Sequence, residues 1–142
     1  MSAARGSLRK HAVVIGGSIA GMIAARILSD HFEKVTVFER DGNLDDARPR
    51  PGVPQARHLH VLLNRGLEIC ESLFPGLRAG LMAEGAPEVR AGLDFRILYP
   101  AGWNPQIDTG MTLVPSTRVL LEQTIRRLLT APNVLWNAAH QV

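Results

Sequence analysis

The fold class of this chain follows from nine residues near its N-terminus, Val13-Val14-Ile15-Gly16-Gly17-Ser18-Ile19-Ala20-Gly21. A continuous apolar run leads directly into a glycine turn, and small and apolar residues follow the turn. Continuous apolar runs of this kind are typical of parallel strands that are buried on both faces. The stretch therefore predicts a buried strand, a tight turn and a helix in immediate succession.

A second strand is predicted at Val35-Thr36-Val37-Phe38, and it ends in Glu39. A strand, turn, helix and strand with an acidic residue at the end of the second strand are the layout of a dinucleotide-binding βαβ unit. We therefore expect an α/β fold with a Rossmann-like βαβ unit over residues 12–40.

The glycine turn supplies the candidate phosphate-binding residues. Backbone N–H groups at a helix N-terminus bind pyrophosphate, and small residues let phosphate oxygens approach them. We expect Gly16 to make the turn and Gly21 to let the helix pack on the strand. Ser18 stands where the pattern has its middle glycine, and its hydroxyl can donate to phosphate. We also expect Gly17, Ile19 and Ala20 to belong to the cofactor-binding segment. The alternative is a glycine turn that binds no ligand.

Two charged residues outside the turn are further candidates. Glu39 is expected to accept hydrogen bonds from ribose hydroxyls and to repel a 2′-phosphate, which favours FAD or NAD over NADP; the alternative is a solvated acid paired with Arg40. Arg118 falls in the first turn of a helix that we expect Ser116 to cap and Leu129 to end. The helix dipole disfavours a cation there, so Arg118 is either a phosphate ligand or an ordinary surface arginine.

The rest of the chain divides into short predicted elements. Residues 1–10 are polar and basic, which indicates a flexible tail. The loop over 41–55 is rich in Pro, Gly and charge, so we expect it at the surface or facing a ligand. Further helices are expected at 19–31, 56–73 and 77–84, and further strands at 95–99, 110–114 and 134–136.

Composition indicates one soluble globular domain. The chain has 142 residues, of which 46% are hydrophobic and 20% charged, with a formal net charge of +3. The arginines are scattered rather than gathered on one face, so we expect no nucleic-acid partner. No apolar run approaches the length of a membrane span.

The cysteine and the histidines do not indicate a disulfide framework or a metal site. Cys70 is the only cysteine; it is expected to be a buried thiol, and the absence of a disulfide framework fits a reducing, cytoplasmic compartment. His58 and His60 stand two residues apart at the start of a predicted helix, where they do not share a face. We therefore expect no metal site.

The motifs together resemble a known family. Residues 13–26 and 35–40 resemble the N-terminus of class A FAD-dependent monooxygenases, the aromatic-hydroxylase-like flavoproteins. Residues 50–63 with 73–77 are similar to the branch that includes bacterial polyether epoxidases, and residues 115–122 resemble the family's Arg-x-x-Leu-Glu helix. The resemblance implies a glutathione-reductase-like FAD-binding domain, reduced by NAD(P)H.

The resemblance also implies roles for individual residues. Gly16, Ser18 and Gly21 would hold the FAD pyrophosphate, and Glu39 the adenosine ribose. Strands within 88–115 would begin a sheet on the substrate side. The other implied cofactor neighbours are Arg118 near the pyrophosphate or ribose, Arg40 and Val142 near the adenine, and Gln55 with the His58 helix towards the flavin ring.

The resemblance covers only the first part of a typical family member. The family's later Asp-Gly and Gly-Asp motifs are absent, so the FAD-binding domain is expected to be incomplete, and no catalytic residue is assigned. The leading expectation is the N-terminal FAD-binding part of a hydroxylase or epoxidase of a bulky apolar substrate. The alternatives are a truncated non-catalytic module, half of a split enzyme completed by a second chain or by self-association, and an NAD-binding domain.

Overall fold

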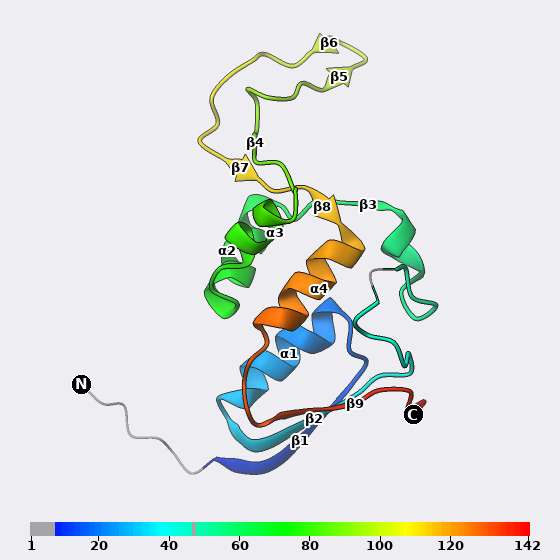
Figure 1. The fold of residues 1–142 in the computed structure, drawn as a ribbon. Helices are drawn as coiled ribbons and strands as arrows, with labels where there is room; N and C mark the ends of the chain where they lie inside the picture. Colours follow the sequence, from blue (N-terminus) through cyan, green and yellow to red (C-terminus); the bar gives the residue numbers. More distant parts are fainter. Residues whose placement is uncertain (1–7, 47) are drawn as a thin grey trace, which may run out of the picture.

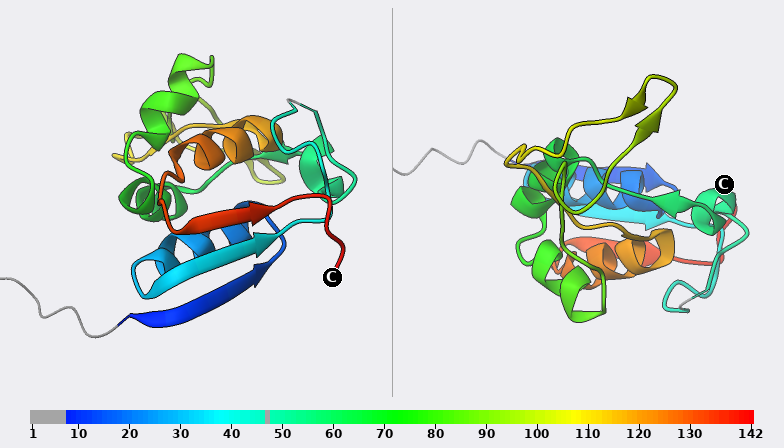
Figure 2. Two further views of the ribbon diagram at one scale, coloured as in Figure 1. Left: turned by 60° about the horizontal axis from the view of Figure 1, so that its bottom comes forward. Right: turned by 90° about the horizontal axis from the view of Figure 1, so that it is seen from above.

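A three-stranded parallel sheet forms the base of the fold in the computed structural model, which describes residues 8–46 and 48–142. Strands β1 (Arg9–Ile15), β2 (Phe32–Phe38) and β9 (Val134–Asn137) lie in the order β1-β2-β9. Helix α1 (Ile19–Ser29) connects β1 to β2, and helix α4 (Arg118–Leu128) precedes β9. All the helices lie on one side of the sheet (Figures 1 and 2). The expected α/β class is confirmed.

The two faces of β1 differ in burial. Ala12 and Val14 are buried on the side of α1, whereas Val13 is 53% and Ile15 70% exposed. The register places Val13 beside Thr36 of the neighbouring strand. The expectation that β1 is buried on both faces is wrong, because no described element covers this second face.

The hydrophobic core lies between the sheet and the helices. Met22 and Ala25 of α1 are fully buried against Val35 and Val37 of β2. Cys70 is buried, as predicted, and burial raises the pKa of its thiol. The other helices and the residues that end them add Leu67, Phe74, Leu77, Leu81, Leu121, Ile125 and Leu129 to the core.

The helix predicted over 56–73 is wrong in its first half. Pro54–Arg57 form the short 3-10 helix η1, and Leu59–His60 form strand β3, so α2 begins only at Asn64 and ends at Leu73. Strand β3 pairs antiparallel with β8 (Ser116–Thr117). This pairing is a tertiary contact, and it overrides the nearly helical spacing of the leucines.

The boundaries of the other predicted elements agree with the structure or differ from it by a few residues. Helix α3 (Leu77–Ala83) matches the short helix predicted there. Arg9 and Lys10 belong to β1, so the tail predicted to reach residue 10 is wrong at its end, and residues 1–7 lie outside the described residues. The first helix ends at Ser29 rather than at residue 31. None of the described helices has the length and apolar character of a membrane span.

The segment after α3 carries two small ribbons. Strands β4 (Val89–Arg90) and β7 (Thr112–Leu113) form one pair, and β5 (Leu98–Tyr99) and β6 (Gly102–Trp103) form a hairpin that projects from the body (Figure 1). Both strands predicted here, at 95–99 and 110–114, are therefore shorter than expected. The hairpin exposes apolar surface, because Leu98 is 61% and Trp103 59% exposed.

We predict that Ile125→Ala lowers the free energy of unfolding by about 2–5 kcal/mol, because it leaves a cavity in a closed core. Ile125 is 0% exposed, whereas Ile27, also in a helix, is 42% exposed. Ile27→Ala is the matched control, with an expected loss below about 1 kcal/mol. Urea unfolding followed by circular dichroism measures both, and equal losses would contradict this description of the core.

Candidate functional site

The glycine turn joins the carboxyl end of β1 to the start of α1. Gly16 has φ 93°, a left-handed conformation that favours glycine, and its N–H donates to the Phe38 carbonyl oxygen at 2.8 Å. A Cβ atom on Gly21 would overlap the Gly16 carbonyl oxygen. Gly16 is therefore favoured by the backbone conformation of the turn, and Gly21 is required by the close packing of the helix on the turn.

Glu39 lies against this turn from the end of β2. Its side chain is buried, and its carboxylate accepts hydrogen bonds from the Gly17 N–H at 2.7 Å and the Asp41 N–H at 3.0 Å. Burial by itself raises the pKa of Glu39, but these two backbone donors and the Arg50 charge outweigh it, so its pKa lies below the usual value. Because Glu39 is buried and lies beside Arg50, the alternative of a solvated Glu39–Arg40 pair is wrong.

Arg50 connects the 41–50 loop to the site. Its guanidinium lies 3.6 Å from the Glu39 carboxylate, 3.1 Å from Asp41 and 2.8 Å from Glu122, and its side chain is only 9% exposed. Sequence reasoning missed Arg50 as a site residue. The signal available was an arginine between two prolines, Pro49 and Pro51, in a loop expected to face a ligand.

Glu122 of α4 completes the cluster from the opposite side. Its carboxylate accepts hydrogen bonds from the Ser18 hydroxyl and, at 2.9 Å, from Arg118 Nε, while Arg118 Nη2 donates to the Ser18 hydroxyl at 2.8 Å. Arg118 is the first residue of α4, and its position one turn before Glu122 allows this pair. Thr117, not Ser116 as predicted, caps α4 by accepting from the Leu120 N–H.

We call Ser18, Glu39, Asp41, Arg50, Arg118 and Glu122 the buried charge cluster. It unites the turn, the end of β2, the 41–50 loop and α4. Burial by itself raises the pKa of Glu122, but hydrogen bonds from Ser18, Arg50 and Arg118 outweigh it, so its pKa lies below the usual value. The Ser18 hydroxyl is used in the cluster and does not cap α1, whose first turn contains no acidic residue. Such a helix N-terminus is suited to an anion.

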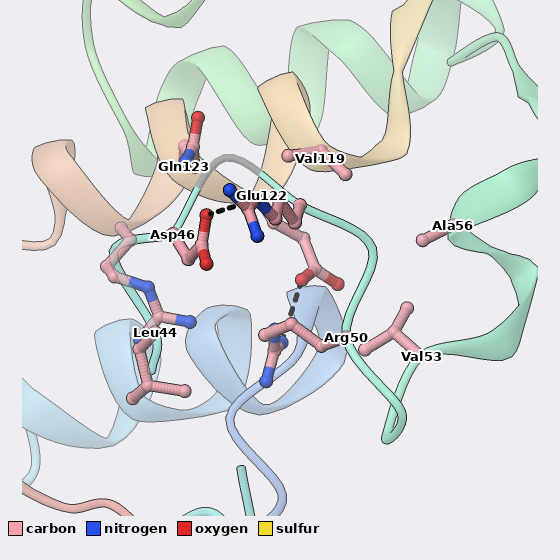
Figure 3. Close-up of a pocket in the computed structure, with 10 residues that line it drawn as sticks. Leu44, Asp46, Arg50, Val53, Ala56, Val119, Glu122 and Gln123 are labelled. Carbon is pink, nitrogen blue, oxygen red and sulfur yellow. Dashed lines mark hydrogen bonds and ion pairs between the residues drawn. The ribbon is translucent and has the colours of Figure 1, made fainter. Parts of the chain in front are cut away.

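A narrow hollow lies beside the cluster, between the 44–56 loop and α4 (Figure 3). Figure 3 shows Arg50 paired with Glu122 at this hollow, with Val53 and Ala56 on the far side. The full lining is Leu44, Asp46, Arg48, Arg50, Val53, Ala56, Val119, Glu122, Gln123 and Arg126. The loop predicted to face a ligand therefore directs Arg50 towards α4, whereas its Arg48 is 83% exposed.

The remaining sequence candidates lie apart from the cluster. Gln55 is an exposed residue of η1, and Val142 is 75% exposed near the end of the chain. Ile19 and Ala20 form the first turn of α1. His58 and His60 lie on no helix face; a His60 ring nitrogen contacts the His58 carbonyl oxygen. Among the described residues, no group of His, Cys, Asp and Glu is arranged to hold a metal ion.

Comparison with known proteins gives one sequence relative. No family model matches the chain. It is 46% identical over 136 residues to protein Rv3254 of Mycobacterium tuberculosis, a match that covers 91% of this chain and 28% of that protein. The chain therefore spans less than a third of the length of this curated relative.

Solved structures share the fold. The chain superposes on 2-methyl-3-hydroxypyridine-5-carboxylic acid oxygenase, in its tetrameric form, with a TM-score of 0.61 and 19% identity, covering 94% of this chain and 32% of that one. It superposes on CmlS, a flavin-dependent halogenase, with a TM-score of 0.58 and 20% identity, covering 94% of this chain and 23% of that one. At these identities the likeness concerns the fold.

We predict that Glu122→Gln makes the free energy of unfolding fall less steeply as the pH is lowered into the acid range. The pKa of Glu122 in the folded state lies below the usual 4.5, so near that pH the unfolded chain binds more protons. The stabilisation is therefore present above the unfolded value and is lost as pH falls from about 5 towards 3.

Unfolding free energies at several pH values measure this effect. Glu33→Gln is the matched control, because Glu33 is an exposed residue of β2, and this variant should keep the parent's profile. If the free energy of unfolding of E122Q fell with acid pH as steeply as that of the parent, the Glu122 carboxylate would not be held by Ser18, Arg50 and Arg118.

Proposed function

We propose that this chain is the N-terminal FAD-binding part of a flavin-dependent monooxygenase. The observation that carries the proposal is the hydrogen bond from the Gly17 N–H to the Glu39 carboxylate. It sets an acid suited to ribose hydroxyls directly beside a glycine turn and a helix N-terminus suited to phosphate. The fold shared with a flavin-dependent halogenase and an oxygenase supports the same class.

The turn offers a helix N-terminus to a pyrophosphate, and packing within the protein requires its glycines. A Cβ atom on Gly17 would lie 2.6 Å from the Trp136 ring and 3.2 Å from Glu39, and one on Gly21 would overlap the Gly16 carbonyl oxygen. We assign the backbone from Gly16 to Gly21 to the pyrophosphate and Glu39 to the adenosine ribose. Ser18 and Arg118 would turn from Glu122 to the phosphates, since both already border the helix N-terminus.

The peripheral assignments follow the family resemblance. Arg40 and Val142 would lie near the adenine, and Gln55 towards the flavin ring. Bound FAD would supply oxygen activation, with NAD(P)H as the electron source. The protein's own contribution in this segment is binding and orientation, and no residue of it is assigned to acid–base catalysis.

The substrate proposal rests on the 88–115 segment. We assign its ribbons to the substrate side and the substrate to a bulky apolar molecule that the enzyme hydroxylates or epoxidises. The exposed Leu98 and Trp103 of the β5–β6 hairpin offer apolar surface of the kind such a substrate or its pocket requires.

FAD uptake by the purified chain tests the cofactor assignment. We expect the chain to retain flavin absorbance after gel filtration with FAD. Glu39→Gln should weaken binding about tenfold, because it keeps an acceptor for Gly17 but loses the charge-assisted bonds to ribose. The matched control is Glu33→Gln, on the exposed part of the same strand.

The outcomes of this titration separate the rival functions. A chain that stays colourless with FAD would overturn the proposal. Uptake of NADH without flavin would instead favour a simple NAD-binding domain, which the βαβ unit alone also permits.

We further propose that a second copy of this chain covers the open face of the sheet. Val13 and Ile15 of β1 and Leu135 of β9 are 53%, 70% and 48% exposed. The register aligns Val13 and Leu135 with Thr36 between them, so the apolar residues lie on one face. One edge of β1 is also unpaired in the described sheet, which invites strand addition.

Light scattering tests this partner proposal. We expect the isolated chain to self-associate above its 15.5 kDa monomer mass, and Ile15→Glu to shift it towards monomer because a charge is placed on the open face. Ile69→Glu is the control, since Ile69 is 45% exposed on α2, away from the sheet. A parent chain that stays monomeric and soluble at all concentrations would contradict the proposal.

A further inference from the structure

Arg126 is the least satisfied charged group near the glycine turn. It lies on α4, its guanidinium is 4.5 Å from the centroid of the Trp136 ring, and its Nη2 donates to the Gly17 carbonyl oxygen at 3.4 Å. Its Nε is buried and has no hydrogen-bond partner within the part of the chain that the structure describes. Arg50 and Arg118, in contrast, both pair with Glu122.

This environment is costly for a cation. Burial lowers the pKa of Arg126, and the charge of Arg50 lowers it further. A buried donor without an acceptor costs free energy, so such a group calls for an explanation. Within the fold the guanidinium contacts the Trp136 ring and the Gly17 carbonyl oxygen, and the proposed phosphate and ribose contacts do not use it.

An open hollow of about 390 Å³ adjoins Arg126 and Trp136. The Trp136 ring also touches the turn, since its Cζ3 would lie 2.6 Å from a Cβ atom on Gly17. The hollow therefore begins where the proposed phosphate and ribose contacts end. Its other lining residues are Gly42, Asn43, Leu44, Asp45 and Ala138.

We propose that Arg126, stacked on Trp136, is a platform for the purine base of the bound dinucleotide. This inference rests on the proposed function and adds a specificity residue to it. A guanidinium is flat, stacks on aromatic faces and is weakly hydrated, so a purine ring laid over its face offsets the cost of the buried charge. The stacking acts on the charge and not on the Nε–H, which lies in the plane of the guanidinium. Leu44 and Ala138 offer apolar contacts at the sides of the ring, and Asn43 a polar edge.

A phosphate group is the rival occupant of this hollow. Asp45 and Arg126 both line the hollow, so the attraction of a phosphate to the arginine is opposed by the carboxylate. A neutral base meets no such repulsion and can still stack on the guanidinium. The lining therefore favours the base.

Quenching of Trp136 fluorescence by AMP tests the platform. The chain has two tryptophans, so Trp103→Phe, on the projecting hairpin, leaves Trp136 as the only reporter. We expect AMP to quench this emission and ribose 5-phosphate, which lacks the base, to leave it unchanged. Arg126→Lys keeps the charge but loses the flat guanidinium, and should weaken AMP binding by roughly five- to tenfold. Arg127→Lys, on the exposed neighbour that pairs with Glu84, should bind as the parent does.

The outcomes separate this inference from the cofactor assignment. Uptake of FAD by the parent chain with no AMP quenching, and with R126K equal to R127K, would overturn the platform while leaving FAD binding in place. Quenching by ribose 5-phosphate as strong as by AMP would assign the hollow to phosphate and also overturn it. AMP quenching in a chain that takes up no FAD would support the platform and reject the flavin. Thermal unfolding followed by circular dichroism checks that the variants keep the parent fold.

Discussion

The hydrogen bond between the Gly17 N–H and the Glu39 carboxylate is the interaction on which the site depends. It ties the turn after β1 to the end of β2, two points that only the parallel pairing of these strands brings together. The same carboxylate accepts the Asp41 N–H and faces Arg50, so it also sets the start of the 41–50 loop. A buried carboxylate remains charged here because its donors outweigh its desolvation.

The buried charge cluster extends this constraint across the chain. Arg50 of the 41–50 loop donates a hydrogen bond to Glu122 on α4, and the Ser18 hydroxyl at the turn donates to the same carboxylate. Buried ion pairs contribute little net stability, yet removing one partner lowers stability because it leaves the other charge buried and unpaired. The cluster is therefore better understood as fixing where the loop and α4 sit around the helix N-terminus than as a source of stability.

Local sequence patterns predicted the turn, α1, the first two strands and β9, because continuous apolar runs and small residues carry those elements by themselves. They also singled out Glu39, Ser18 and Arg118. The patterns missed β3, because its pairing with β8 involves residues far away in the chain. They did not single out Arg50, Glu122 and Arg126 for the same reason: each is an ordinary charged residue until the fold brings it close to the turn.

Amide chemical shifts test the central claim most directly. If the turn held by Glu39 binds the dinucleotide, adding FAD to the isotope-labelled chain will shift the amide signals of Ser18 and Ile19 most, because these residues form the helix N-terminus that would bind the phosphates, whereas the Gly17 N–H donates to Glu39. Signals of the projecting β5–β6 hairpin will stay in place as an internal reference. Unmoved turn signals, or the largest shifts at the hairpin, would contradict the account.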